Sequence, residues 1–490
     1  MSAASSVTGS ETSRPTPHLR SAKRLSFSPQ ERRLAAAVTA FAVAGLYLLF
    51  VLHYSINLIF WDEWANVPVV HAALHSHLTF GALWSQHNEN RIFVPNLLVV
   101  LSALIEDYNS KTIILLGACF FIASYVLLLG AFRSYLGRPL TVLHSLTLGL
   151  VWFSLEDTEN SLWGFQLAWY LVVFFLMVLV ALLKRGRDHR NLVLAIAILV
   201  AVAASFSSLQ GLILWPVGLM YLVWDGPRNR RMYLECAVWI MSCALTMLAY
   251  FRGFNFASTG DTPGFALHHP IGMAKFFLAA VGNVVPTTNP DLPTHEILGL
   301  ILFVVSVLVV FFSLRESSEQ RRHPLPIALI LFGVLFDASI VFGRISGGIG
   351  AALSTRYTMA NLLLLVGVLT YAWAHLPSAR ALRRDLNGLR AVRHAAVALL
   401  AVFLAVQFAT ATKNGLASAR TDRQDRIIGA RTIVNLDRIA PSQADELISL
   451  YVYPNAVALA PFLREAEADH LSVFAPGPFD YYRTKGPPPS

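Results

Sequence analysis

The sequence predicts an all-α fold: a polytopic transmembrane helical bundle with about 11 to 12 spans, short surface helices in the first outer loop and a small soluble C-terminal tail. Hydrophobic residues occupy 55% of the 490 positions and charged residues 14%, against about 25% charged residues in ordinary soluble domains. The mean hydropathy is +0.55, and the apolar residues form runs of about 20, enough to span a bilayer core as helix. A soluble globular enzyme and a disordered chain are therefore excluded.

The chain divides into three predicted parts. Residues 1–33 are basic and rich in Ser, Thr and Pro, which is typical of a disordered cytoplasmic tail. Residues 34–412 hold the apolar runs and form the transmembrane domain; the first run, 34–60, is an uncleaved anchor. Residues 413–490 carry nine basic and nine acidic residues and are expected to form a small extracytoplasmic domain, with Asn455 opening one of its helices.

The order of the apolar runs and the charge of their connections predict the topology. Connections 133–138, 184–190, 225–231, 315–322 and 380–393 hold 17 basic and five acidic residues, so they are expected to face the cytoplasm. Connections 60–90 and 155–161 contain only acidic charges and are expected to face outward. Eleven crossings with the amino terminus inside satisfy this alternation, provided that 92–105 does not cross fully. After the anchor, further runs lie near 111–132, 140–154, 162–183, 191–207, 209–224, 232–251, 296–314, 325–343, 354–376 and 393–412.

Two adjacent carboxylates, Asp62 and Glu63, follow the anchor between Trp61 and Trp64. Desolvation at the rim of the hydrocarbon region raises the basicity of a carboxylate and favours proton transfer, so both are candidate catalytic residues. The alternative is that the tryptophans belong to the aromatic belt and the acids are solvated.

A polar cluster follows this pair. Residues 65–85 are expected to form one or two short helices parallel to the membrane, and the sequence Gln-His-Asn-Glu-Asn-Arg then fills positions 86–91. Six consecutive polar residues at a membrane boundary are costly unless they are solvated or line a cavity. His87, Asn88, Glu89 and Arg91 are therefore candidate substrate-binding residues, ahead of an apolar helix that contains Pro95.

This order of elements resembles the amino-terminal module of the GT-C glycosyltransferases, the superfamily of the protein O-mannosyltransferases and the lipid A aminoarabinose transferase. The resemblance covers about residues 34–132. It implies transfer of a sugar from a polyprenyl-phosphate donor on the non-cytoplasmic face, with Asp62 as the base or acceptor-binding carboxylate and Glu63 as the second acid of the pair. The family's first loop often carries a Lys-Pro-Pro or His-Pro-Pro sequence, whereas this chain has the cluster at 87–91 and Pro95.

A leaving phosphate requires cations, and Arg344 and Arg356 stand near the ends of the Gly-rich connection that begins with residues 343–350. Arginine binds phosphate with two parallel hydrogen bonds, and glycines let backbone N–H groups approach an anion. Arg356 and Tyr357 open the next helix, so both are candidate substrate-binding residues; a flexible turn that contacts lipid headgroups is the alternative. Asp337, in the outer half of an apolar helix, is expected to pair with Arg344 or Arg91, in the substrate site or as a purely structural ion pair.

The acidic segment 156–160 leads through Trp163 to Gln166 at the mouth of a helix. Glu159 and Gln166 are candidates for binding sugar hydroxyl groups, with a solvated acidic turn as the alternative.

No metal site is predicted, and the need for a divalent cation is left open. Cys119, Cys236 and Cys243 lie inside apolar runs, and His268 and His269 are adjacent, which does not place them on one helical face. The net charge of +9 lies in the short loops, where topology explains it, so no nucleic-acid partner is expected.

The sequence therefore favours an inverting glycosyltransferase of the inner or plasma membrane, whose partners are a polyprenyl-phosphate sugar donor and membrane lipid. The active site and the carboxyl terminus are expected to be extracytoplasmic. A transporter or lipid flippase, an O-antigen ligase or polymerase-like enzyme, and a receptor or assembly scaffold are the alternatives. No inverted repeat supports a transporter, and donor sugar, acceptor and oligomeric state are left open.

Overall fold

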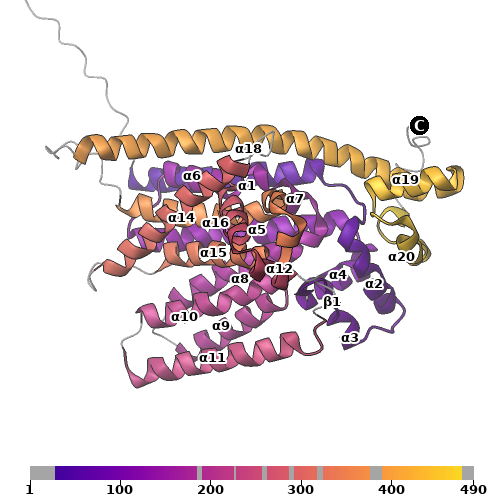
Figure 1. The fold of residues 1–490 in the computed structure, drawn as a ribbon, viewed down its shortest axis with the longest axis horizontal. Helices are drawn as coiled ribbons and strands as arrows, with labels where there is room; N and C mark the ends of the chain where they lie inside the picture. Colours follow the sequence, from indigo (N-terminus) through magenta and orange to yellow (C-terminus); the bar gives the residue numbers. More distant parts are fainter. Residues whose placement is uncertain are drawn as a thin grey trace, which may run out of the picture.

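The computed structural model describes residues 28–184, 190–225, 228–255, 262–285, 292–316, 324–375 and 389–476. These residues are almost entirely helical, and the helices lie side by side along one long direction (Figure 1). The predicted tail 1–33 lies outside the described residues up to position 27. Helix α1 begins at Pro29, where the Ser28 hydroxyl accepts a hydrogen bond from the Glu31 backbone and the Glu31 side chain accepts one from the Ser28 backbone.

Eight helices of the described residues are long and apolar enough to cross a membrane. They are α1 (Pro29–Tyr54), α5 (Ser110–Leu136), α8 (Leu167–Lys184), α11 (Arg230–Phe251), α14 (Leu292–Arg315), α15 (Leu325–Arg344), α16 (Thr358–His375) and α18 (Leu389–Val434). A sharply bent pair near the carboxyl terminus would raise the number to nine.

The helical membrane bundle is thus observed, but the count of about 11 to 12 spans is not confirmed. Several apolar runs counted as crossings form helices too short to span a bilayer alone, because polar turns break them early. These runs form α6 (Val142–Trp152), α9 (Arg190–Ser205) and α10 (Leu214–Asp225). The run 92–105, whose crossing was left open, forms α4 (Phe93–Glu106), and the connection after α11 holds α12 (Thr262–His268) and α13 (Pro270–Gly282).

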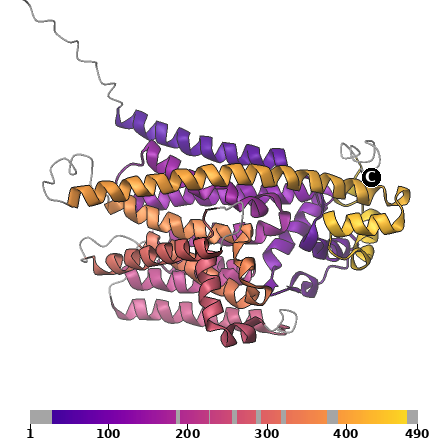
Figure 2. The same ribbon diagram turned by 45° about the horizontal axis from the view of Figure 1, so that its top comes forward.

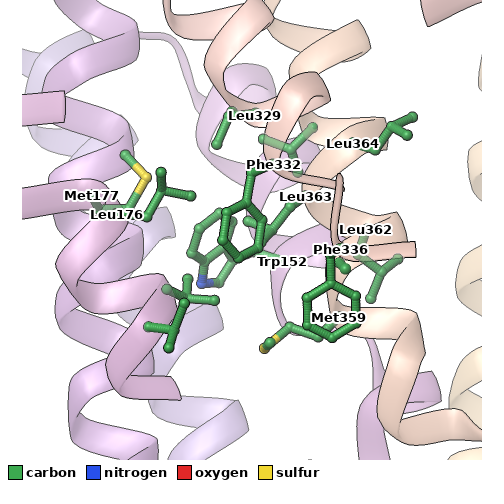
Figure 3. Close-up of a cluster of buried hydrophobic side chains, with 14 of the residues drawn as sticks. Trp152, Leu176, Met177, Leu329, Phe332, Phe336, Met359, Leu362, Leu363 and Leu364 are labelled. Carbon is green, nitrogen blue, oxygen red and sulfur yellow. The ribbon is translucent and has the colours of Figure 1, made fainter. Parts of the chain in front are cut away.

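The core of the bundle is packed from large apolar side chains and close helix contacts. Figure 3 shows Trp152 of α6 between Met177 of α8 and Phe332 of α15, and all three side chains are buried. Elsewhere α13 and α14 pack so closely that a Cβ atom on Gly282 would overlap the carbonyl group of His295. Small residues allow such contacts between membrane helices, where dispersion replaces the hydrophobic effect as the main attraction.

The segment after α1 forms a small group of short elements at one end of the bundle. It comprises the 3₁₀ helix η1 (Trp61–Asn66), α2 (Val67–Leu74), α3 (Phe80–Leu83) and a hairpin of β1 (Gln86–His87) and β2 (Asn90–Arg91). The strands are antiparallel, with Gln86 opposite Arg91. Short surface helices were expected here, whereas the hairpin was not; its turn needs Asn88 in the left-handed region, at φ 50°.

Helix α18 has 46 residues, which corresponds to a length of about 69 Å, more than a bilayer core requires. Figures 1 and 2 show it running along the whole bundle. It continues without a break through Lys413, where the composition changes, so residues 413–434 are the end of this long helix rather than a separate unit.

The chain then forms α19 (Pro441–Tyr451), α20 (Ala456–Ala468) and the 3₁₀ helix η10 (Ser472–Phe474), which we call the C-terminal unit. Asn455 caps α20 as expected, since its side chain accepts a hydrogen bond from the Ala458 backbone. The unit shares a buried apolar cluster with η1 and α2, to which Val67, Leu459 and Leu463 belong. The segment that follows α1 and the C-terminal unit therefore lie together at one end of the molecule (Figure 1).

Candidate functional site

Most of the candidate residues meet at this end of the bundle, in a narrow hollow that we call the Asp62 pocket. Its cavity volume is about 40 Å³, room for one or two water molecules. It is lined by Asp62, Asn88, Glu89, Asn90, Ile92, Trp163, Phe165, Gln166, Ala168, Trp169, Ser208, Ile340, Arg344, Arg356 and Tyr357. Seven of these residues were selected from the sequence, from segments nearly 300 positions apart.

The backbone of η1 directs Asp62 toward this pocket. Trp61 has a φ of 49°, an uncommon conformation for a bulky side chain, and its backbone N–H donates to the carbonyl oxygen of Val452 in the C-terminal unit at 3.0 Å. Asp62 follows with a partly exposed carboxylate, and its Oδ1 lies 3.6 Å from Nε2 of His87. This separation is slightly longer than a direct hydrogen bond, so a small movement of either side chain would form one.

Glu63 points away from the pocket, into the protein. Its carboxylate is fully buried and accepts hydrogen bonds from the Phe60 backbone at 3.0 Å and from the Ser110 hydroxyl at 2.9 Å. Burial raises the pKa of this carboxyl to about 7, although the Arg426 guanidinium and the two hydrogen bonds act in the opposite direction. The two acids of the pair therefore have different environments: one faces the pocket and the other holds η1 against α5.

Arg426, on the last third of α18, was not selected from the sequence. Its guanidinium lies over the ring of Phe60 at 4.3 Å, and the residue is only 6% exposed. Its charge interacts with Glu63, Asp422 and Glu159, so it offsets the acidic charge of both η1 and the Glu159 region. In the sequence, Arg426 is one of nine basic residues of the segment 413–490, which is predicted to form a separate domain, and nothing else distinguishes it.

Two ion pairs lie at the edges of the Asp62 pocket. Arg344, at the end of α15, lies 2.6 Å from Oε1 of Glu89 in the hairpin turn. Arg356, in the 3₁₀ helix η8 (Thr355–Tyr357), lies 3.7 Å from Oε1 of Glu159 and donates a hydrogen bond to the Ser354 hydroxyl. Both guanidinium groups are about one-third exposed, so they are accessible to a ligand as well as to these carboxylates.

A second and larger hollow, which we call the Glu159 cavity, lies on the Glu159 side of the Arg356–Glu159 pair. Its volume is about 490 Å³, within the range of small-molecule sites. Its lining is largely polar: Leu155, Glu156, Thr158, Glu159, Asn283, His295, Leu353, Thr355, Asn414, Gly415, Ala417, Ser418 and Asp422. The 3₁₀ helix η2 (Leu155–Asp157), α7 (Thr158–Leu162) and the middle of α18 therefore build a polar chamber beside the Asp62 pocket.

Two acids of the 156–160 segment are buried rather than solvated. Burial raises the pKa of Glu156 to about 8. Burial likewise raises the pKa of Asp157 well above its ordinary value, while hydrogen bonds from Asn160 and Tyr170 act against this. The Glu159 side chain is about one-third exposed and accepts a hydrogen bond from the Thr355 hydroxyl at 3.2 Å.

Arg91 and Asp337 do not line the Asp62 pocket. Arg91 is buried, and its guanidinium donates to the backbone carbonyl oxygens of Trp84, Tyr250 and Arg252, so it ties the hairpin to the end of α11. Asp337 is fully buried on the face of α15 that also carries Arg344, two turns away. Neither of its carboxylate oxygens has a hydrogen-bond partner among the described residues, so the expected ion pair with either arginine is not seen.

One group of side chains in the described part of the chain has the donors and spacing for a metal ion, and it lies outside both hollows. It consists of His71, His75 and Asp469. This group is not predicted from the sequence because the aspartate lies nearly 400 residues from the histidines along the chain. The available signal was the spacing His-x₃-His on a short helix.

Comparison with known proteins assigns no family. No family model, no curated protein and no solved structure matches this chain.

Proposed function

We propose that this protein is a membrane glycosyltransferase that transfers a sugar from a polyprenyl-phosphate donor to an extracytoplasmic acceptor. The observation that carries the proposal is the meeting of a partly exposed carboxylate, Asp62, with two accessible guanidinium groups, Arg344 and Arg356, in one pocket of a membrane protein. Such a transfer needs a proton acceptor beside the attacking hydroxyl and cations around the leaving phosphate. The resemblance of residues 34–132 to the GT-C module points to the same chemistry.

The proposed step is a direct displacement at the anomeric carbon. The acceptor oxygen forms a bond to this carbon while the bond from the carbon to the phosphate oxygen breaks, and its electron pair leaves with the phosphate. The acceptor proton passes to the Asp62 carboxylate, and Arg344 and Arg356 neutralise the charge that develops on the phosphate. Attack from the side opposite the phosphate inverts the anomeric configuration. His87, whose Nε2 lies 3.6 Å from the Asp62 carboxylate, is placed to orient it.

The volume of the Asp62 pocket implies that the donor must open it. At about 40 Å³ it cannot hold a sugar phosphate, and the Glu89–Arg344 ion pair closes one side. The donor phosphodiester offers Arg344 one charge on two oxygens, as a carboxylate does, and it gains further charge as the bond to the sugar breaks, so its attraction for Arg344 grows toward the transition state. We therefore assign Glu89 as the group that occupies Arg344 until the donor displaces it.

The Glu159 cavity suits a sugar, the part of the reactants that carries most hydroxyl groups. Its volume of about 490 Å³ and its lining of carboxylates, amides and hydroxyls match a sugar-sized polar ligand. The Arg356–Glu159 pair joins it to the Asp62 pocket, so a sugar bound there lies next to the proposed phosphate site.

The proposed orientation follows from where the helices end. Helix α5 begins at Ser110, which contacts Glu63, and Arg133 in its last turn lies about 35 Å away. Helix α8 likewise begins beside Gln166 and ends at Lys184, whose amino group donates to the carbonyl oxygen of Gly130. The basic ends of these helices therefore lie far from the site, and the positive-inside rule assigns them to the cytoplasm. The site and the C-terminal unit are then extracytoplasmic, in the inner or plasma membrane.

The test is sugar transfer in proteoliposomes supplied with a panel of radiolabelled polyprenyl-phosphate sugars and a membrane extract as the source of acceptor. Wild-type protein should transfer label, and Asp62→Asn should lose at least about 99% of the rate, the smallest effect typical of losing a general base. Asp107→Asn is the matched control, since Asp107 is exposed at the end of α4 in a left-handed conformation that asparagine also adopts. Equal activity of Asp62→Asn and the control would refute the assignment.

A transporter or flippase is the second candidate, and Asp337 is the observation that favours it. An unpaired carboxylate buried in a spanning helix is typical of ion and proton pathways. Uptake of a labelled substrate into the same proteoliposomes, lost in Asp337→Asn and accompanied by no transfer of sugar, would replace the glycosyltransferase proposal.

A further inference from the structure

His71, His75 and Asp469 lie at the junction of the first outer segment and the C-terminal unit. The His75 backbone N–H donates to the His71 carbonyl oxygen at 3.1 Å, so the helical turn of α2 continues through both residues and their rings share one face. Asp469 ends α20 and is followed by His470 and Ser472, both in the left-handed region. This turn brings the carboxylate against α2.

The three side chains form a compact set of donor atoms. Nδ1 of His71 lies 2.7 Å from one carboxylate oxygen of Asp469, and Nε2 of His75 lies 2.9 Å from the other. The two imidazole rings are 4.4 Å apart, and one donor atom from each of the three residues lies within 4.8 Å of the others. In a tetrahedral zinc site with bonds of about 2.0–2.2 Å, donors are about 3.4 Å apart, so the two histidine–aspartate separations would widen by about 0.5–0.7 Å to admit the ion.

The charge of the cluster also favours binding of a cation. The Asp469 side chain is only 6% exposed, and its ion-pair partners within the described residues are the two histidines. A cation held by the two imidazoles would offset the charge of this nearly buried carboxylate. The histidine side chains are 39% and 52% exposed, so an ion reaches the cluster from solvent and a water molecule completes its coordination.

We infer that His71, His75 and Asp469 bind a zinc ion that fastens the C-terminal unit to α2. Two imidazole nitrogens and a carboxylate oxygen are ligands typical of zinc, whereas magnesium and calcium prefer sites made of oxygen atoms. The ion joins segments 398 positions apart and lies eight residues from Glu63 along the chain, so it supports the frame that holds η1. The site is structural and does not depend on glycosyl transfer.

Full-length protein in detergent, stripped with a chelator and then titrated, tests the inference. Wild-type protein should bind one zinc ion per chain, and cobalt in its place should give the visible absorption of a tetrahedral site. Zinc should also raise the temperature of thermal unfolding. His75→Ala should weaken zinc binding at least about 100-fold, since losing a supporting hydrogen bond to a ligand already costs 10- to 100-fold.

Two further variants make the experiment decisive. His77→Ala changes an exposed histidine of the same loop outside the cluster, and it should bind zinc like the wild type. Asp62→Asn should also bind zinc normally, whether or not it transfers sugar, which separates this inference from the proposed function. His75 is exposed, so His75→Ala should elute as a folded protein in size-exclusion chromatography. Absence of zinc binding by the wild type, or equal binding by folded His75→Ala, would leave only a hydrogen-bonded His-Asp-His cluster and overturn the inference.

Discussion

The buried carboxylate of Glu63 makes Gly164 intolerant of any side chain. Gly164 opens the 3₁₀ helix η3 (Gly164–Gln166), and a Cβ atom built on it would overlap Oε1 of Glu63. Gly164→Ala must therefore displace this carboxylate from the Phe60 backbone and the Ser110 hydroxyl. Hydrogen bonds to a charged group contribute about 1.5–3 kcal/mol each, so losing one or both should lower the free energy of unfolding by about 2–5 kcal/mol.

The assay is unfolding of full-length protein in mixed micelles, followed by circular dichroism. Gly130→Ala is the matched control, because Gly130 lies within helix α5 with open space where its Cβ would be, and alanine there should be neutral or up to about 1 kcal/mol stabilising. Glu63→Ala combined with Gly164→Ala should cost less than the sum of the single changes, because the overlap is then removed. Stability of Gly164→Ala equal to that of Gly130→Ala would refute the packing described for Glu63.

The remaining predictions concern the Arg344–Glu89 pair and the buried acid of the Glu159 cavity. Glu89→Gln should strengthen binding of a polyprenyl phosphate by freeing Arg344, and Arg344→Gln should weaken it about 10- to 100-fold, the worth of one charge-assisted contact; equilibrium binding of labelled lipid measures both. Changes in the same direction would contradict the competition between Glu89 and phosphate. The pKa of Glu156 is raised from its ordinary 4.5 to about 8, so the folded protein binds a proton that the unfolded chain loses in this range. The contribution of Glu156 to the free energy of unfolding is therefore complete below pH 4.5 and decreases as the pH rises to 8. Glu156→Gln should therefore flatten the pH dependence of thermal unfolding in this window, and an unchanged slope would show that the carboxyl does not titrate there.

The sequence was sufficient for the class of fold and for much of the pocket, because both depend on local signals. Apolar runs identify membrane helices, and polar residues at their ends identify what must be solvated or enclosed; Asp62, Glu89, Arg344 and Arg356 were found in this way. The number of spanning helices was less accessible, since hydropathy alone does not show where a turn ends a helix. Helices such as α9, with 16 residues, were counted as full crossings for this reason.

What the sequence could not supply depends on side-chain direction and long-range contact. Adjacent acids look equivalent in sequence, yet the turn at Trp61 exposes Asp62 and buries Glu63. Arg91 sits in a polar cluster, but the hairpin commits its guanidinium to backbone carbonyl groups. Arg426 reaches the site only because α18 runs far beyond the bilayer-spanning length.

The most direct test of the central claim separates binding of the donor from the chemical step in Asp62→Asn. Equilibrium binding and single-turnover transfer are measured with the same labelled polyprenyl-phosphate sugar. If Asp62 accepts the proton while Arg344 and Arg356 hold the phosphate, the variant should bind the donor within about twofold of the wild type and transfer at least about 100-fold more slowly. Transfer at the wild-type rate, or loss of donor binding with the rate of bound donor unchanged, would contradict the account.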